Sequence, residues 1–346
     1  MTRIAINGLG RIGRVFMKLA FEHPALEVVA ANDISDPDSL AYLIKYDSAY
    51  GMHHAAVRVE RAGSDVWLQV GAHRLRLLAE RRPEALPWKA LDVQIVVEAS
   101  GAFETYGDAR RHIDAGAAHV VLTAPAKDED TGDARTVLMG VNQEELALSR
   151  ISSNGSCTTN SAASVIDVLR EAIGVRKAML NTVHGYTATQ TLVDTAVRGR
   201  DLRRGRAAAA NIVPATTGAA IAVTRAIPAL RHRFDGVALR VPVLSGSLSS
   251  IVAVTDRRTT VDEVNAVLIR AAQDDRWSGI LATTTDPLVS SDIVGDPHGA
   301  IVDLSLTKVV DGDLCAVYSW YDNEFGFANT LLAHVAACAA LQVMPT

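Results

Sequence analysis

One cysteine of this chain stands in surroundings that suit a reactive thiol. Cys157 lies in the run Ser152-Ser153-Asn154-Gly155-Ser156-Cys157-Thr158-Thr159-Asn160, just before an amphipathic helical pattern. A helix N-terminus carries unpaired backbone N–H groups and partial positive charge, which favour a thiolate. His184 follows at the end of a predicted strand, and an imidazole can take the thiol proton. The spacing predicts a nucleophile, Cys157, with His184 as its base. The alternatives are a small buried cysteine and a hydrogen-bonded core histidine.

The first forty residues predict a dinucleotide-binding βαβ unit. An apolar strand pattern at 2–7 is followed by Gly8-Leu9-Gly10-Arg11-Ile12-Gly13, a helical pattern and a second strand at 26–31. In this arrangement Gly8 permits the tight turn, Gly10 lets the backbone approach a pyrophosphate, and Gly13 allows close helix packing. The alternative is a strand-to-helix turn in which the glycines are incidental.

The acidic residue after the second strand indicates which dinucleotide is bound. Asp33 lies 20 positions after Gly13, where a carboxylate accepts hydrogen bonds from the adenosine ribose and repels a 2′-phosphate. This predicts NAD rather than NADP. Two further strands, at 93–98 and 119–122, end in small residues that include Ser100 and Thr123. Ligands gather at the carboxyl ends of parallel strands, so these residues leave room for the cofactor.

Composition limits the class of protein. The chain has 346 residues, of which 49% are hydrophobic and 21% charged, and a net charge of -5, a profile typical of a globular protein with two domains. No long charged run indicates nucleic acid or a membrane as partner, and the uncharged segment 207–223 contains Asn, Pro and Gly. We expect a cytoplasmic protein, because the first residues lack a signal peptide. The three cysteines are far apart in sequence, and we expect neither a disulfide framework nor a metal site.

The pattern changes along the chain. Alternating apolar residues between 57 and 78 predict an antiparallel insertion, and strand patterns at 237–241 and 249–255 predict a largely antiparallel sheet in a second domain. Helices are expected at 262–272 and at 330–341.

Six segments in this order resemble the phosphorylating glyceraldehyde-3-phosphate dehydrogenase family over nearly the whole chain. They are Asn7-Gly8-Leu9-Gly10-Arg11-Ile12-Gly13-Arg14, Lys45-Tyr46-Asp47-Ser48, Ser156-Cys157-Thr158-Thr159-Asn160, Thr217-Gly218-Ala219-Ala220, Arg240-Val241-Pro242 and Trp320-Tyr321-Asp322-Asn323-Glu324.

The resemblance implies an α/β fold and a chemical reaction. The fold would have a Rossmann NAD-binding domain at 1–156, an α+β catalytic domain with a mixed or antiparallel sheet at 157–321, and a C-terminal helix at 322–346 packing on the first domain. The enzyme would be a homotetramer that oxidises glyceraldehyde 3-phosphate with NAD and inorganic phosphate, through a hemithioacetal and a thioacyl enzyme on Cys157.

The resemblance also assigns roles to matching positions. Dinucleotide contacts would come from Arg11, Ile12, Asp33, Arg81, Thr123 and Asn323, with Asn323 holding the nicotinamide carboxamide. The substrate phosphate and the attacking phosphate would be held by Ser156, Thr158, Thr187, Thr217, Gly218 and Arg240. Hydroxyls, backbone N–H groups and a guanidinium are the groups that bind phosphate, so these types fit the task.

Several alternatives stay open at this stage. The loop 194–204 is longer than is usual in the family and carries Thr195-Ala196, which leaves NADP as a second cofactor candidate. The substrate alternative is erythrose 4-phosphate, oxidised with water as acceptor. Further alternatives are a specialised paralogue, resistant to a thiol-reactive inhibitor or using arsenate, and a non-catalytic NAD-binding scaffold.

Overall fold

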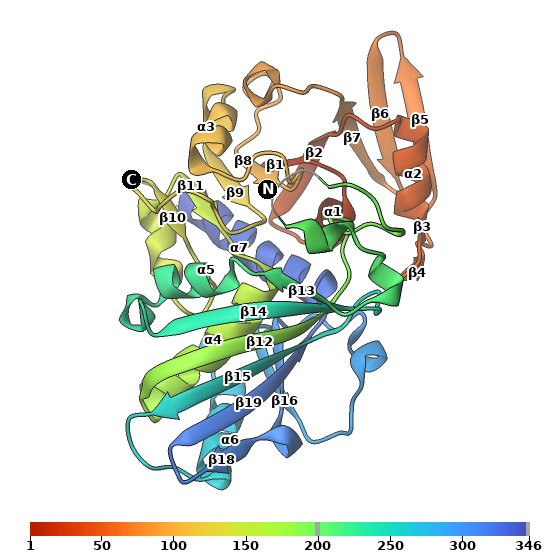
Figure 1. Ribbon diagram of the computed structural model, residues 1–346. Helices are drawn as coiled ribbons and strands as arrows, with labels where there is room; N and C mark the ends of the chain where they lie inside the picture. Colours follow the sequence, from red (N-terminus) through yellow and green to blue (C-terminus); the bar gives the residue numbers. More distant parts are fainter. Residues whose placement is uncertain (198–200, 344–346) are drawn as a thin grey trace. The chain divides into compact units, whose positions relative to one another are not determined.

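The computed structural model describes residues 1–197 and 201–343 (Figure 1). The chain divides into two compact units. Unit 1 comprises Met1–Val137, Gln143–Gly155 and the residues from Leu331 on, and unit 2 comprises Leu138–Asn142 and Ser156–Thr330. Part of the predicted loop at 194–204, namely 198–200, and the end of the predicted C-terminal segment, 344–346, lie outside the described residues.

Unit 1 is built on a nine-stranded sheet in the order β10-β11-β9-β8-β1-β2-β7-β6-β5. The strands from β10 to β7 are parallel to their neighbours, and β7, β6 and β5 are antiparallel. The strands are β1 (Thr2–Asn7), β2 (Leu26–Asn32), β5 (Val57–Ala62), β6 (Asp65–Val70), β7 (His73–Leu78), β8 (Ile95–Glu98), β9 (His119–Leu122), β10 (Ala134–Thr136) and β11 (Ile151–Ser153). The remaining elements are the pair β3 (Tyr46–Asp47) and β4 (Gly51–Met52), and the helices α1 (Arg11–Phe21), α2 (Pro37–Lys45) and α3 (Tyr106–Asp114).

The first helix lies against the sheet because its sequence has one apolar face. In α1 the residues Val15, Phe16 and Ala20 recur at helical spacing and are buried. Gly13 lies on the same helix, and a Cβ atom at this position would lie 2.0 Å from the carbonyl oxygen of Gly8. The glycine at 13 therefore sets how closely α1 approaches the turn after β1.

A buried polar network joins the ends of three strands of unit 1. Asn32 donates to Asn7, which donates to Glu98. The Glu98 carboxylate also contacts His112 Nε2, while Trp88 Nε1 donates to His112 Nδ1. Since an indole N–H can only donate, His112 carries its proton on Nε2 and gives it to Glu98. Asn7, Asn32, Glu98 and His112 thus all have partners within this network, which stabilises the relative positions of β1, β2 and β8.

Unit 2 contains an eight-stranded mixed sheet in the order β13-β14-β12-β15-β19-β17-β16, with β18 paired to β19. The pairs β12–β14 and β16–β17 are parallel and the other pairs are antiparallel. The strands are β12 (Val175–Gly185), β13 (Val213–Thr216), β14 (Phe234–Val241), β15 (Ser247–Thr255), β16 (Leu281–Thr284), β17 (Ala300–Asp303), β18 (Lys308–Val310) and β19 (Leu314–Tyr321).

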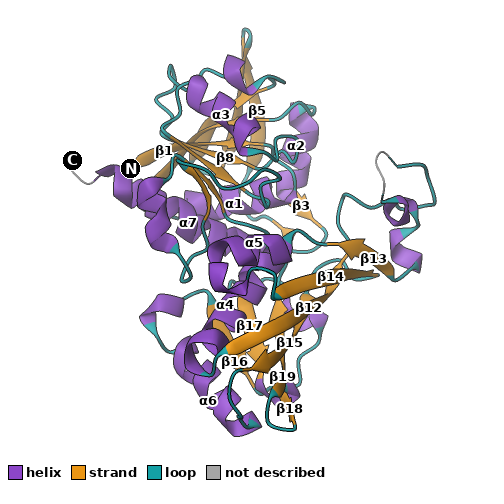
Figure 2. Ribbon diagram, turned by 60° about the vertical axis from the view of Figure 1, so that its left-hand side comes forward, coloured by secondary structure: helices purple, strands orange, loops and turns teal. Residues whose placement is uncertain are grey.

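The helices of unit 2 cover one face of this sheet. The helices are α4 (Cys157–Ala172), α5 (Ala219–Ala226) and α6 (Val261–Ala272), and Figure 2 shows α4 and α6 along the strands. Alternate strand residues such as Ile251 and Val317 are buried beneath them. The opposite face carries Met179, Val252 and Ala316, which are neighbours across β12, β15 and β19. Met179 is 50% exposed, so this row of apolar side chains reaches the solvent.

The chain ends in a long apolar helix, α7 (Phe325–Val343), which begins five residues before the start expected from sequence. Its residues up to Thr330 belong to unit 2 and those from Leu331 belong to unit 1. The segment Phe325–Gln342 is long and apolar enough to cross a membrane, with a mean hydropathy of 1.3, yet 50% of it is buried in the protein. Core helices of globular proteins share this composition, so the segment is weak evidence for a membrane span.

The predicted fold class is confirmed. The Rossmann-type βαβ unit, the mixed sheet of the second unit and the C-terminal helix are all present. The expected insertion at 57–78 forms β5, β6 and β7, of which β7 returns parallel to β2.

Substitution of two glycines in the first loop should show which of them is required for packing. Gly13→Ala would force the new methyl group against Gly8, so we expect the free energy of unfolding to fall by about 1 to 3 kcal/mol. Gly10→Ala is the matched control, because a Cβ at Gly10 meets no heavy atom within 4 Å. Its stability should fall by less than that of Gly13→Ala, because only the preference for glycine over alanine at the N-cap is lost. Urea unfolding of both variants measures this, and equal losses would contradict the packing role of Gly13.

Candidate active site

The start of α4 fixes the position of Cys157. Ser156 is the N-cap residue, and its hydroxyl accepts from the backbone N–H of Thr159. The Thr159 hydroxyl in turn accepts from the backbone N–H of Ser156, which completes a reciprocal capping box. Cys157 is therefore the first residue of the helix, where backbone N–H groups have no partner within the helix.

The predicted base lies next to the predicted nucleophile. His184, near the end of β12, is 3% exposed, and its Nε2 atom lies 3.3 Å from Cys157 Sγ. The Nδ1 atom of the same ring lies 2.7 Å from the carbonyl oxygen of Gly185. Nδ1 also lies 2.6 Å from the Arg240 guanidinium, which can only donate, so the carbonyl favours a proton on Nδ1 and the guanidinium favours a lone pair there. The tautomer with the proton on Nδ1 is the one that presents the Nε2 lone pair to the thiol.

Strand register brings Arg240 to the same place. In the parallel pair of β12 and β14, His184 is opposite Arg240. The Arg240 guanidinium lies 2.6 Å from His184 Nδ1 and donates to the Gly185 carbonyl at 3.2 Å. A positive charge is thus held behind the imidazole and close to the thiol.

Burial and this charge determine the resting protonation of the pair. Burial, followed by the charge of Arg240, lowers the pKa of His184 to about 3, so its imidazole is neutral at physiological pH. Burial raises the pKa of the Cys157 thiol, while Arg240 and the Thr158 hydroxyl act in the opposite direction. Burial thus opposes the thiolate that the helix start and the histidine favour. The resting pair is a thiol facing a neutral imidazole.

Sequence reasoning did not single out Tyr321, the last residue of β19. Its hydroxyl contacts Thr158 Oγ1 at 2.8 Å and Thr182 Oγ1 at 2.7 Å, and its ring meets the His184 ring edge-on. Tyr321 therefore ties the first turn of α4 to β12. The only signal was its place in the segment that begins with Trp320, because its two hydroxyl contacts join residues 163 and 139 positions apart in the sequence.

The adjoining Asn323 is also held near His184. Asn323 Oδ1 accepts from the Ser247 hydroxyl, and Gly185 lies so close that a Cβ there would be 3.5 Å from the same oxygen. Asp322 accepts from the Ser245 hydroxyl and is fully buried. These contacts fix the turn between β19 and α7.

The remaining predicted phosphate ligands occupy loops and a helix start. Thr187 follows β12, and its hydroxyl contacts that of Thr189. Thr217 accepts from the backbone N–H of Ala219, and Gly218 is the N-cap of α5.

A second guanidinium, which sequence reasoning did not single out, lies near this site. Arg204 donates to the Thr189 hydroxyl at 2.9 Å. Burial lowers the pKa of Arg240, and the like charge of Arg204 lowers it further. Arg204 shares its charge with Asp201 in an ion pair of 2.9 Å, and the Arg240 guanidinium near it suits an anionic ligand.

In unit 1 the glycine-rich turn is shaped for a dinucleotide. Gly8 has φ +100°, and a Cβ there would lie 2.5 Å from the backbone of Ser100. Gly10 is the N-cap of α1 and has open space around it, so a ligand can approach the helix N-terminus. Asp33 Oδ2 accepts from the backbone N–H of Leu9 at 2.8 Å, which places the acidic group beside the turn.

A cavity of about 250 Å³ opens beside this turn. It is lined by Asn7, Gly8, Asn32, Asp33, Ile34, Glu80, Arg81, Ser100, Ala102 and Phe103. Asp33, Arg81 and Ser100 were predicted from sequence, whereas Glu80 and Phe103 were not, since no local motif marks a cavity wall. Thr123 follows β9, where its hydroxyl donates to the Glu98 carbonyl.

Arg11 and Ile12, both predicted to contact the dinucleotide, are the first two residues of α1. Arg11 forms an ion pair with Asp47 at 2.7 Å, and its guanidinium lies over the Tyr50 ring. Ile12 is partly buried. The positive charge of Arg11 at the N-terminus of α1 is therefore partly neutralised by Asp47.

Two family models match the chain. One, described as glyceraldehyde 3-phosphate dehydrogenase, NAD binding domain, matches residues 2–106. The other, described as glyceraldehyde 3-phosphate dehydrogenase, C-terminal domain, matches residues 156–323.

Curated proteins named glyceraldehyde-3-phosphate dehydrogenase are similar to nearly the whole chain. The protein from Streptomyces coelicolor is 44% identical over 95% of this chain and 96% of its own length. The protein from Mycobacterium tuberculosis is 46% identical over 95% and 96%, respectively. The protein from Geobacillus stearothermophilus is 43% identical over 98% of each chain.

Removal of the Arg240 charge should make Cys157 less reactive. Arg240→Gln takes away a charge that lowers the pKa of the thiol, so this pKa should rise. Below the pKa, each unit of increase reduces the thiolate fraction about tenfold, and alkylation by iodoacetamide slows in proportion. The rate of Cys157 labelling against pH, followed by mass spectrometry, measures the shift.

Two control variants test whether charge is the cause. Arg240→Lys keeps a cation and should shift the profile less, and Arg231→Gln removes an exposed arginine elsewhere and should not shift it. Overlapping profiles for the parent and Arg240→Gln would refute the electrostatic role.

Proposed function

Because this chain belongs to the glyceraldehyde-3-phosphate dehydrogenase family, we propose that it oxidises D-glyceraldehyde 3-phosphate to 1,3-bisphosphoglycerate, with NAD as electron acceptor and inorganic phosphate as second substrate. The observation that carries the proposal is the 3.3 Å contact between Cys157 Sγ and His184 Nε2, with Arg240 behind the ring.

NAD is the cofactor of this family's N-terminal domain, and the residues of unit 1 fit it. The open space at Gly10, at the N-terminus of α1, suits a pyrophosphate. Asp33 borders the adjoining cavity, where it would accept hydrogen bonds from the ribose hydroxyls and repel a 2′-phosphate. Gly8, Gly13, Arg11, Ile12, Arg81, Ser100 and Thr123 would complete the dinucleotide site, and Asn323 would hold the carboxamide. The bound nicotinamide supplies the acceptor for a hydride.

Cys157 and His184 carry the covalent chemistry. As Cys157 Sγ bonds to the aldehyde carbon, the thiol proton passes to His184 Nε2 and the carbonyl oxygen takes the electron pair. The backbone N–H of Cys157, at the first position of α4, and the protonated His184 can stabilise that oxygen. After oxidation of the hemithioacetal, an oriented phosphate oxygen attacks the thioester carbon and the Cys157 sulfur leaves.

Phosphate groups are held by two guanidiniums and a set of hydroxyls. Arg240 would bind one phosphate, and Arg204 adds a second positive charge near it. Ser156, Thr158, Thr187, Thr217 and Gly218 would supply hydroxyl and backbone N–H donors.

The neutral state of His184 is required for proton transfer, because a neutral ring can accept the thiol proton in every cycle.

The assembly is a homotetramer in the cytoplasm, without nucleic acid or a membrane as partner. The outer face of unit 2 supports self-association, since Met179, Val252 and Ala316 form a row of apolar side chains there. Large exposed apolar surfaces commonly mark interaction sites.

Phosphate dependence tests the reaction. With NAD and glyceraldehyde 3-phosphate, NADH should form continuously only when phosphate is present. Without phosphate, the thioacyl enzyme should accumulate after a burst of about one NADH per chain. Continuous NADH formation without phosphate would contradict the proposal and favour hydrolysis, and parallel assays with erythrose 4-phosphate and with NADP test the substrate and the cofactor.

Replacement of the nucleophile tests the role of Cys157. Cys157→Ser should lower kcat by about 10⁴-fold or more, because a serine hydroxyl beside a neutral imidazole is a far weaker nucleophile than a thiol. NAD binding, measured by calorimetry, should remain. Cys315→Ala is the control, since Cys315 lies in the hydrophobic core of unit 2, and it should retain activity. A Cys157→Ser enzyme with parental kcat would refute the covalent mechanism.

A further inference from the structure

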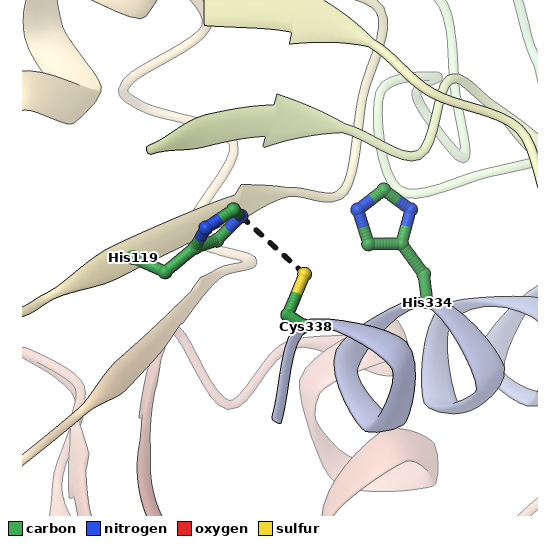
Figure 3. Close-up of side chains that lie close together, drawn as sticks. All are labelled: His119, His334 and Cys338. Atoms are coloured by element: carbon green, nitrogen blue, oxygen red, sulfur yellow. Dashed lines mark hydrogen bonds between the residues drawn. The ribbon is translucent and has the colours of Figure 1, made fainter. Parts of the chain in front are cut away.

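A second cluster of chemically reactive side chains lies in the core of unit 1, separate in its residues from the proposed chemistry. His119 projects from β9, while His334 and Cys338 project from α7 (Figure 3). Cys338 is four positions after His334, so both lie on the same face of the helix. All three side chains are buried, with 6%, 0% and 2% of their surfaces exposed. No metal site was expected from the sequence, because 219 positions separate His119 from Cys338.

The ligand atoms of the three residues converge. One ring nitrogen of each histidine and the Cys338 sulfur lie within 4.8 Å of one another. Cys338 Sγ lies 3.4 Å from His119 Nε2. Around a tetrahedral zinc ion, with Zn–N of about 2.0 Å and Zn–S of about 2.3 Å, neighbouring ligand atoms are about 3.3 to 3.6 Å apart. Small side-chain shifts therefore suffice to close the cluster around an ion.

A serine hydroxyl provides a fourth donor. Ser152, on β11, is fully buried, and its Oγ lies 2.9 Å from His119 Nε2 and 2.7 Å from His334 Nε2. The hydroxyl thus completes a set of two nitrogens, one sulfur and one oxygen. Nitrogen and sulfur donors together select a borderline ion such as Zn²⁺ over Mg²⁺ or Ca²⁺.

The outer contact of His334 suits a metal ligand. His334 Nδ1 faces Asn154 Oδ1 at 3.2 Å. An oxygen acceptor at this nitrogen holds the proton there and leaves Nε2 as a lone pair, which is the arrangement that orients metal-binding histidines.

The same atoms can hold either protons or a cation. In the protonated state a neutral His119 can donate from Nε2 to the Ser152 oxygen, and the Ser152 hydroxyl can donate to His334 Nε2. In the metal-bound state both Nε2 atoms, the Ser152 oxygen and the Cys338 sulfur turn to one ion. The convergence of a second nitrogen and a sulfur on one point is what favours the ion.

We propose that His119, His334 and Cys338 bind one Zn²⁺ ion, with the Ser152 hydroxyl as a neutral fourth ligand. On binding, the Cys338 thiol releases its proton to solvent and the thiolate bonds to zinc, with no change in oxidation state. The ion is structural. It joins α7 to β9 within unit 1, and its binding free energy adds to the stability of that unit.

Metal content and the cobalt spectrum of the full chain test the proposal. All measurements use the Cys157→Ser variant as the parent protein. This removes the other thiol–imidazole pair, Cys157 and His184, which can itself bind metal ions. We expect close to one zinc ion per chain after expression with zinc and gel filtration. After exchange, Co²⁺ should give the intense near-ultraviolet band of a cobalt–thiolate bond and the visible bands of tetrahedral cobalt.

Matched cysteine variants identify the ligand. In this parent protein, Cys338→Ala should lose the near-ultraviolet band and retain less than about a tenth of the zinc, whereas Cys315→Ala should keep both. His334→Gln provides a second test that removes a nitrogen ligand and leaves the thiol. A strong chelator should lower the Tm of the Cys315→Ala protein but not that of Cys338→Ala.

Two outcomes would overturn the proposal. One is a folded parent protein that takes up neither zinc nor cobalt, which would make the cluster a hydrogen-bonded network only. The other is a cobalt spectrum without a thiolate band, or one that Cys338→Ala leaves unchanged. Metal content and the cobalt spectrum do not depend on dehydrogenase activity. A failure of the zinc proposal can therefore be distinguished from a failure of the proposed function.

Discussion

The register between β12 and β14 is the constraint on which the site in unit 2 depends. These strands run parallel, and the pairing puts Arg240 opposite His184, so the guanidinium and the imidazole share the Gly185 carbonyl. A slip by one residue would turn Arg240 to the outer face of the sheet and leave the imidazole without its positive neighbour. The same strand end faces the first turn of α4, which Tyr321 joins to β12 through two hydroxyl contacts. One register therefore sets the position of the ring, the nearby charge and the approach to the sulfur.

Burial has opposite consequences for the two partners of the thiol–imidazole pair. It raises the pKa of Cys157 and lowers that of His184, so each group is held in its neutral form. A neutral thiol is protected from oxidation and from adventitious electrophiles, since the thiolate is the reactive form. A neutral imidazole in contact with it can accept the proton only as the new carbon–sulfur bond develops. The arrangement favours reaction with a bound aldehyde over reaction with small molecules in solution.

The parts of this molecule that local sequence determines were predictable, and the parts that distant pairing determines were not. The glycine turn and Asp33 follow from spacing within one βαβ unit, and the placement of Cys157 at a helix start follows from its polar neighbours. The roles of Tyr321 and Arg204 were not predicted, because their positions come from strand pairing and loop packing rather than from any short pattern. The protonation of the resting pair was also beyond sequence, because desolvation depends on how deeply the finished fold buries His184. The cluster around Cys338 needs β9, β11 and α7 to meet before its chemistry exists.

Asp33 is proposed to select the cofactor, and the same carboxylate also holds the glycine turn in place. One of its carboxylate oxygens accepts from the backbone of Leu9, inside the glycine turn, and the other accepts from the backbone of Ser35. Exchange for a neutral side chain is the simplest way to admit a 2′-phosphate, but an asparagine would leave one acceptor oxygen for these two backbone N–H groups, and an apolar residue would leave none. Redesign of this pocket for the phosphorylated dinucleotide would therefore have to rebuild the anchoring of Leu9 at the same time. A change of cofactor preference and a change in the stability of the binding loop are therefore coupled at this one position.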